Sequence, residues 1–244
     1  MTMSNLSIET FNFMAELWEN NNKTWFDANR KRYTQNVQQP MKAMAESLTG
    51  AVSALLPEYN GRTKISRINN DIRFTPDKPP YKEHMWISFL TEFFPNCDYF
   101  VAIGHNGWAA GSGIGSNRKE DLDCWRKNLL TYQTIWRKYA KAADFGEKVN
   151  VYIDNLYKKP LFPDIPEDMV KLVQGKSIWL VQAPRLDFEK SPEEEFLHGL
   201  GIMLPYFLFM TVQTNLLPDR LSELGGKIPA PDKEIRELWK KLGG

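Results

Sequence analysis

Apolar residues recur at helical spacing in the first quarter of the chain. Ile8, Phe11 and Met14 are three residues apart and form one apolar stripe. This stripe predicts a helix over residues 7–22, with Ser7 as its N-cap. The same spacing predicts two more helices, over residues 23–36 and 40–56.

Alternation of apolar and polar residues replaces this spacing after Gly61 and predicts a run of strands. The pair Asn106-Gly107 lies between two such runs, and this dipeptide is a strong signal for a β-hairpin. The predicted strands cover residues 65–74, 84–91, 98–104, 108–114, 149–155 and 177–182.

Helical spacing returns between and after the later strands. The predicted helices cover residues 118–143, residues 167–173 and a segment that begins near Ser191. Within that last segment, residues 196–218 contain no charged side chain and are long enough to cross a bilayer. They also contain Gly199, Pro205 and Asn215, so we favour a buried core helix over a membrane span.

The order of these elements predicts an α+β fold, in which a predominantly antiparallel sheet is packed by N-terminal and C-terminal helices on one side. We expect residues 1–218 to form a single globular domain. Residues 219–244 contain two glycines followed by two prolines, which predicts a linker and a short helix over residues 232–242.

Composition and charge disfavour several classes of protein. Hydrophobic residues make up 42% of the chain and charged residues 25%, which is typical of a soluble globular protein. There are 31 basic and 30 acidic side chains, which leave a net charge of +1. Strong binders of nucleic acid or of acidic membranes carry a larger positive excess, so we expect neither as a partner.

Cysteine usage predicts neither a disulfide scaffold nor a structural zinc site, because only Cys97 and Cys124 are present. A single disulfide between them stays open. Residues 1–11 lack the basic and then apolar pattern of a secretory signal, so we expect a cytoplasmic protein. No metal site is predicted, because the histidines show no ligand spacing. They are His84, His105 and His198.

A dense block of polar residues covers residues 65–82. If its first half is a strand, four side chains share one face: Arg67, Asn69, Asp71 and Arg73. The loop that follows contains three prolines and adds Asp77, Lys78, Tyr81 and Lys82. Arginine, lysine and tyrosine gathered in one place are groups that hold phosphate or carboxylate. The alternative is an ion-pair network that attaches the loop to the sheet.

A second candidate anion site lies in the glycine-rich segment 104–115. Its end contains Gly111, Gly113 and Gly115 and precedes a helix predicted to begin near Asn117. Backbone N–H groups at such a turn bind anions. The segment has neither a Walker A ending nor the spacing of a dinucleotide fingerprint, and a closely packed strand-to-helix turn is the alternative.

The glycine segment and the polar block are expected to meet. Trp108, beside Gly107, is a candidate for stacking on a ligand. Successive antiparallel strands are usually neighbours, so the strand predicted over 65–74 and this hairpin share one sheet. Gly111, Gly113 and the arginines would then open onto one cleft.

Two stretches of the chain resemble a known family. Residues 67–82 read RINNDIRFTPDKPPYK, and residues 11–33 read FNFMAELWENNNKTWFDANRKRY. Together they resemble the uncharacterised family called domain of unknown function 2461, whose members show RI-x-RD-x-RF-x-x-DKSPYK and FLxxLxxNNxRxWFxxxKxxY. The resemblance covers most of residues 9–215 and implies an α/β globular fold with no established activity. The matching positions are Asn21, Asn22, Trp25, Phe26, Tyr33, Arg67, Asp71, Arg73, Phe74, Asp77, Lys78, Tyr81 and Lys82.

This chain departs from the family pattern in two places. Asn70 stands where an arginine is common, which removes one positive charge. The glycine-rich segment lacks the proline that often follows it in relatives.

These observations predict a cytoplasmic protein with a cleft for a phosphorylated or carboxylated small molecule. In this hypothesis Arg67, Arg73, Lys78 and Lys82 bind the anion, and Asp71 orients the arginines or acts as a base. The alternative is a structural or protein-interaction module whose Arg/Asp block is a scaffold. No reaction, cofactor or oligomeric state is assigned.

Overall fold

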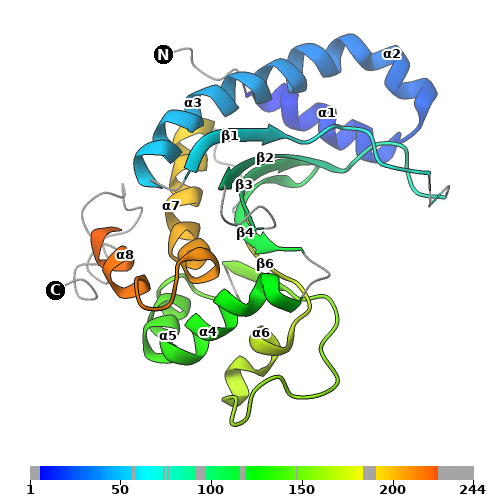
Figure 1. Ribbon diagram of the computed structural model, residues 1–244. Coiled ribbons are helices and arrows are strands. Elements are labelled where there is room, and N and C mark those ends of the chain that lie inside the picture. The colour runs from blue at the N-terminus through cyan, green and yellow to red at the C-terminus, as the bar shows by residue number, and fades with distance from the viewer. Residues whose placement is uncertain are drawn as a thin grey trace.

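The computed structural model shows a six-stranded antiparallel sheet packed against helices (Figure 1). The residues that it describes are 6–56, 59–73, 75, 77–91, 97–115, 119–146, 148–183 and 191–224. The strand order is β1-β2-β3-β4-β6-β5. The strands are β1 (Tyr59–Ile65), β2 (His84–Thr91), β3 (Cys97–Gly104), β4 (Gly107–Ile114), β5 (Val149–Tyr152) and β6 (Ile178–Gln182). The predicted α+β class is confirmed.

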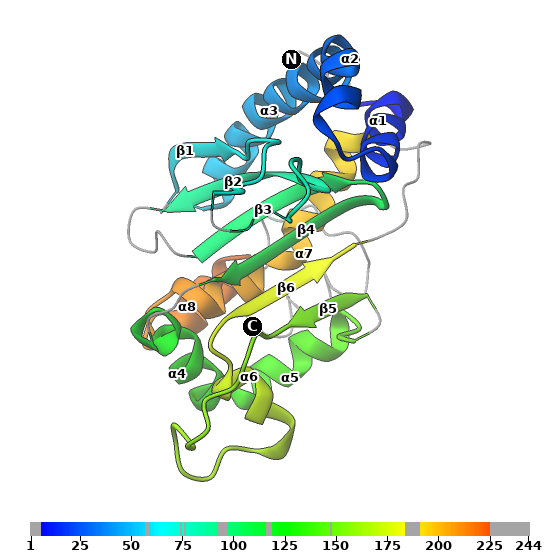
Figure 2. The ribbon, with the colours of Figure 1, turned by 90° about the vertical axis from the view of Figure 1, so that its right-hand side faces the viewer.

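Helices precede, interrupt and follow the strands. The α-helices are α1 (Ile8–Glu19), α2 (Lys23–Tyr33), α3 (Gln39–Leu55), α4 (Asp123–Thr131), α5 (Gln133–Ala142), α6 (Val170–Gln174), α7 (Pro192–Thr211) and α8 (Leu217–Leu224). Short helical turns are η1 (Thr34–Gln38), η2 (Lys119–Leu122) and η3 (Glu167–Met169). Figure 2 looks onto the face of the sheet that none of the labelled helices crosses, with α7 behind the strands.

The second and third predicted helices form one continuous helical rod. Asn22 begins it as N-cap, because its side chain accepts a hydrogen bond from the Trp25 N–H at 3.0 Å. The π-helical segment η1 joins α2 to α3 without a break. Pro40 therefore lies in the first turn of α3 but does not start a separate helix. The predicted boundary between residues 36 and 40 is wrong for this reason.

Helix α7 is the central helix of the core. Ser191 is its N-cap, and every residue from Gly199 to Thr211 is buried. The ring of Tyr99 in β3 packs 5.0 Å from that of Phe207, and the Tyr99 hydroxyl donates to the Leu200 carbonyl. The predicted buried core helix is thus confirmed. Within the described part of the chain, no helix has the length and hydropathy that a bilayer crossing needs.

The strands alternate between the two faces of the sheet. In β2, Met85, Ile87 and Phe89 are buried toward the helices. The intervening side chains, which include His84 and Trp86, point to the opposite face of the sheet, where they line a pocket. This uncovered face is the part of the fold that positions the candidate site.

The strand predicted over residues 65–74 is wrong. β1 ends at Ile65. The backbone hydrogen bond that follows it runs from the Ser66 N–H to the Trp86 carbonyl of β2, at 2.8 Å. Residues 66–83 then leave the sheet and return to β2. This segment, the 66–83 excursion, has one isolated bridge between Asn69 and Tyr81. Strand alternation therefore does not place the polar block on one face.

The helix predicted over residues 118–143 is divided. Its described part consists of η2, α4 and α5, and the chain breaks helical geometry at Tyr132, where φ is −114° and ψ is 43°. The short helix predicted over 167–173 is confirmed as η3 and α6. Helix α8 was not predicted, and it crosses the expected domain boundary at residue 218. The linker and helix predicted beyond residue 224 lie outside the described residues.

The two cysteines are free thiols, which closes the question of a disulfide between them. Both contact the last turns of α7. The Cys97 thiol lies 3.8 Å from the Met210 sulfur, and the Cys124 thiol donates to the Val212 carbonyl at 3.0 Å. Burial raises the pKa of Cys97 well above its ordinary value and that of Cys124 to about 11.

Candidate functional site

Uncharged contacts anchor the 66–83 excursion to the N-terminal helices. The ring of Tyr81 is buried and stacks on that of Phe26, with ring centres 4.0 Å apart and planes 18° apart. The Asn70 amide donates to the carbonyls of Pro79 and Tyr81 at 2.8 and 2.9 Å. Asn70, which replaces a common arginine of the family, is thus a bracing residue within the excursion.

Lys82 joins the excursion to the sheet. Its ammonium donates to the carbonyls of Arg67 and Asn69 at 2.5 and 3.1 Å, and it lies 5.3 Å from the centre of the Trp86 ring. Burial lowers the pKa of Lys82, and the positive charges of Arg67, Lys78 and Lys64 lower it further. An ammonium has three N–H donors, so two carbonyls leave one for another partner.

Asp71 and Arg73 pair with each other at the exposed tip of the excursion. Arg73 donates to the two Asp71 carboxylate oxygens at 2.9 and 2.6 Å. This hydrogen bonding lowers the pKa of Asp71, and the charges of Arg67 and Lys78 add a smaller effect. A carboxylate held in its ionised form in this way is a weak base. The predicted network therefore contains a direct pair of Arg73 with Asp71, and Arg67 acts on it only through its field.

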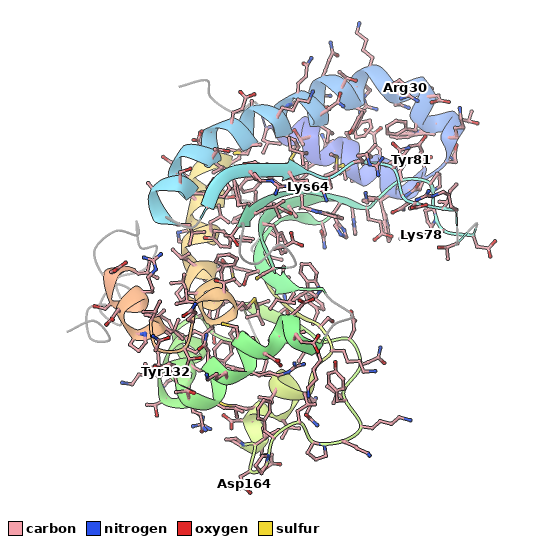
Figure 3. All side chains as sticks on the ribbon, in the orientation of Figure 1. Arg30, Lys64, Lys78, Tyr81, Tyr132 and Asp164 are labelled. Carbon is pink, nitrogen blue, oxygen red and sulfur yellow. The ribbon has the colours of Figure 1, made fainter. Side chains whose placement is uncertain are left out.

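Exposed cations surround Lys82. Lys64 on β1 and Arg67 and Lys78 on the excursion are exposed, and within the described residues none of the three forms a salt bridge. In Figure 3, the label of Lys64 marks β1, and the labels of Lys78 and Tyr81 mark the excursion. We call Lys64, Arg67, Lys78 and Lys82 the basic rim. Asn69 and Asp77, also predicted for the site, are exposed on the same excursion.

A pocket of about 620 Å³ lies on the uncovered face of the sheet. Strands β2, β3, β4, β5 and β6 all contribute to it. Its aromatic side chains are Trp86, Phe100, Tyr152 and Trp179, and its polar side chains include His84, Ser88 and Asp98. Because Trp86 lines the pocket and also lies against Lys82, the basic rim meets the pocket at Lys82.

The floor of the pocket is made of very small residues. Across the sheet, Trp86 pairs with Ala102 and Ala102 with Ala109. In the next row, His84 pairs with Gly104. In these two rows, β3 and β4 present no side chain larger than a methyl group, whereas β2 presents the rings of Trp86 and His84 beside them.

The glycines of β4 accommodate aromatic rings. A Cβ on Gly111 would lie 2.6 Å from Phe100 Cζ, and one on Gly113 would lie 2.6 Å from Trp179 Cδ2. The two rings meet edge to face, with centres 6.0 Å apart. Gly111 and Gly113 are therefore inside a strand, paired with β3 and β6, and not in the predicted strand-to-helix turn. Their backbone groups take part in the sheet, so the anion cradle is not formed.

Trp108 does not face the pocket with its ring, although it was predicted to stack on a ligand. The side chain is buried on the helix side of the sheet, and its ring lies 5.1 Å from that of Phe196 in α7. Gly199 approaches the same ring closely, so a Cβ there would be 2.8 Å from Trp108 Cζ3. The role of Trp108 is packing between β4 and α7.

Two titratable groups of the pocket have shifted pKa values. Burial raises the pKa of Asp98, and a hydrogen bond from the Ser88 hydroxyl and the charge of Lys64 reduce this rise. Burial lowers the pKa of His84, with a smaller opposite effect of Glu83. His84 is therefore mainly neutral near pH 7. Within the described residues, no group of three or more His, Cys, Asp and Glu side chains is placed to hold a metal ion.

The predicted shared cleft forms only in part. The excursion and the pocket are neighbours through Lys82 and Trp86, but the glycines contribute space under aromatic rings and no anion-binding N–H groups. A family model for conserved hypothetical proteins, DUF2461, matches residues 9–200. The chain belongs to the DUF2461 family. No similar curated protein and no similar solved structure was found.

The DUF2461 match covers both the anchored excursion and most of the pocket. The sequence reasoning did not identify the pocket residues on the strands, above all Trp86, Phe100, Asp98 and Trp179. Their signal is visible in hindsight, because large aromatic residues occupy the strand positions that alternation assigns to the outer face. Large apolar side chains on both faces of a strand are typical of a sheet whose outer face is covered by other elements or by a partner.

Proposed function

We propose that this protein binds a small molecule bearing a phosphate or carboxylate group in the pocket on the uncovered face of the sheet, and that it does so in the cytoplasm. The observation that carries the proposal is the position of Lys82. Its ammonium lies against the Trp86 wall of the pocket, and the charges of Arg67, Lys78 and Lys64 already lower its pKa.

Charge is the physical basis of this proposal. When an anion binds between cations that repel one another and lack salt bridges, the repulsion is offset and the free energy of the system falls. The basic rim contains such cations on one side of the pocket, whereas the net charge of the chain is only +1. Phosphate and carboxylate are the groups that Arg and Lys hold best.

The experiment is calorimetric titration with inorganic phosphate, ribose 5-phosphate and citrate. We expect at least one to bind the wild type, and the double variant Lys64→Ala/Arg67→Ala to lose at least about tenfold in affinity, which corresponds to about 1.4 kcal/mol. Lys138→Ala, an exposed lysine of α5, is the matched control and should bind as the wild type does. Binding that survives the double variant unchanged contradicts the proposal.

A scaffold role for the polar block is the second candidate, and the hydrogen bonds of Lys82 to the carbonyls of Arg67 and Asn69 favour it. In that case the uncovered face would contact another protein. Urea denaturation separates the two roles. A scaffold role requires Lys82→Met to lower stability, because the substitution leaves both carbonyls without this donor. An anion site predicts no loss for Arg67→Ala, because that substitution keeps the carbonyl and relieves repulsion with Lys82.

A further inference from the structure

We infer that the ligand of this pocket carries a planar aromatic or heteroaromatic ring, which lies on the small-residue floor while its anionic group reaches the basic rim. This inference rests on the proposed function and adds the chemical class of the ligand. It follows from the shape of the pocket, not from its charge.

The floor consists of small residues and is wide enough for a ring. Ala102 and Ala109 are directly paired on adjacent central strands, and Gly104 pairs with Gly107 in the next row. Strands are spaced by about 4.8 Å, so β2 and β6, three strand spacings apart, are separated by about 14 Å. In these two rows β3 and β4 present only methyl groups and backbone, whereas Phe100 of β3 stands one row further along the sheet.

Aromatic side chains border this floor. Trp86 lies at the β2 side, next to Ala102. Phe100 and Trp179, in edge-to-face contact over Gly111 and Gly113, close the end toward the next row of the sheet. Aromatic rings prefer edge-to-face or offset stacking on other rings, and each such pair adds affinity beyond area burial.

The arrangement disfavours two other kinds of anion. A sugar phosphate needs hydrogen-bond partners all around its ring, whereas the polar side chains of the pocket, which are His84, Ser88, Asp98, Asn106 and Tyr152, stand around the Ala and Gly floor and not on it. An unbranched acyl chain needs a long channel, whereas Phe100 and Trp179 meet across one end of the floor. A ring fits both the width and the walls.

One ligand can place its ring on the floor and its anionic group at the basic rim at the same time. Lys82 lies against Trp86, and Trp86 pairs with Ala102 of the floor. A ring over Ala102 and Ala109 therefore places a short substituent near the third N–H of Lys82, where Arg67 and Lys64 also act. The carboxyl group of Asp98 belongs to the opposite end of β3 from Gly104 and so lies away from this substituent.

Matched phosphate monoesters test the inference. The probes are 1-naphthyl phosphate, hexyl phosphate and methyl phosphate, with AMP and ribose 5-phosphate as a second matched set, each titrated by calorimetry. We expect a ring to increase affinity about tenfold over its ringless counterpart in at least one set, as two ring contacts predict. Hexyl phosphate that binds as tightly as 1-naphthyl phosphate overturns the ring assignment.

A second experiment replaces a small residue of the floor by a larger one. Ala109→Leu should remove the preference for ring-bearing probes and leave the affinity for methyl phosphate within about threefold, because the basic rim is unchanged. Ala109→Ser keeps the floor small and should bind as the wild type does. If Ala109→Leu does not fold, Trp86→Ala removes a wall and should reduce the same preference.

The outcomes separate the two proposals. Equal binding of ring-bearing and ringless phosphates, sensitive to Lys64→Ala/Arg67→Ala, overturns the ring inference and keeps the proposed function. No binding of any probe overturns both. A ring preference that Ala109→Leu and Trp86→Ala both leave intact shows that the ring lies elsewhere and overturns the inference.

Discussion

The side chain of Asn21 pairs with the backbone of Tyr81, although 60 residues separate them in the chain. Its Oδ1 accepts from the Tyr81 N–H at 3.0 Å, and its Nδ2 donates to the Tyr81 carbonyl at 2.9 Å. One side-chain amide thus satisfies both backbone groups of a residue, as a neighbouring strand would. The contact joins the two stretches through which the chain resembles its family.

Replacing Asn21 by alanine should destabilise the protein. The change removes two hydrogen bonds and leaves the Tyr81 backbone without these partners, so we expect a loss of about 1–3 kcal/mol in the free energy of unfolding. Urea denaturation measures it. Asn12→Ala is the matched control, because its single bond to Glu9 is exposed, and it should change little. Equal midpoints for the two variants would show that the Asn21 contact is not formed in solution.

Two arginines should differ sharply in their effect on stability. Arg126 in α4 is fully buried and donates to the carbonyls of Val173, Lys119 and Gly175 at 3.0, 2.7 and 2.9 Å. Arg126→Met should cost about 3–5 kcal/mol, because it removes this donor from two buried carbonyls, those of Val173 and Gly175, and from the partly buried carbonyl of Lys119. Arg73→Ala, at an exposed ion pair, should leave the urea midpoint unchanged. A large loss for Arg73→Ala would support the scaffold role.

Two glycine-to-alanine changes should have opposite signs. Gly111→Ala places a methyl group 2.7 Å from the Leu180 carbonyl oxygen and 2.6 Å from Phe100, so we expect a loss of about 1–3 kcal/mol and an altered near-ultraviolet circular dichroism spectrum. Gly50 in α3 has no atom near its missing Cβ, and Gly50→Ala should stabilise the protein by roughly 0.5–1 kcal/mol. Thermal unfolding compares the two, and a stabilising Gly111→Ala would contradict the packing of Phe100 on β4.

The pH dependence of stability should reveal Asp98. Its pKa in the folded state is raised, so its protonated form stabilises the fold at low pH, and this contribution is lost as the pH rises from 3.8 through the folded-state pKa. Asp98→Asn should therefore gain stability relative to the wild type as the pH rises from about 4 to 7. Urea midpoints at several pH values measure the trend.

Asp71 provides the control of opposite sign. Arg73 lowers its pKa, so its ionised form stabilises the fold above 3.8, and that contribution is lost as the pH falls through the folded-state pKa. Asp71→Asn should lose stability relative to the wild type above 3.8, to the small extent that an exposed pair allows. Parallel pH curves for the two variants would show that burial does not raise the pKa of Asp98.

The strands of the central sheet could be predicted because local alternation and burial agree there. The hairpin predicted at Asn106-Gly107 forms, but its turn consists of His105 and Asn106, and Gly107, with a φ of 125°, is the first residue of β4. Alternation misled the prediction over residues 65–74, where the partners that decide the path of the chain are Asn21 in the α1–α2 turn and Phe26 in α2. No local pattern contains the pairing of Asn21 with Tyr81, so the excursion could not be derived from the sequence alone.

The candidate site was predictable only in its charges. The basic residues of the excursion stand out in the sequence, but their neighbour Lys64 belongs to β1, which was not predicted. The strand predicted over residues 108–114 is confirmed as β4, but the interpretation of its glycines as an anion-binding turn before a helix is not, because Gly111 and Gly113 share one face of that strand. The rings of Phe100 and Trp179 occupy the space that Gly111 and Gly113 leave open. Which rings lie there depends on the order of the strands in the sheet.

Cys97 contacts the end of α7, so the reactivity of its thiol reports whether β3 and α7 have separated. Thiolates, not thiols, react with alkylating reagents, and burial keeps Cys97 protonated and out of reach. Its alkylation must therefore wait until β3 separates from α7. When reclosing is faster than the reaction, the labelling rate measures the free energy of that opening, so mass spectrometry can follow how firmly the sheet is held to its central helix.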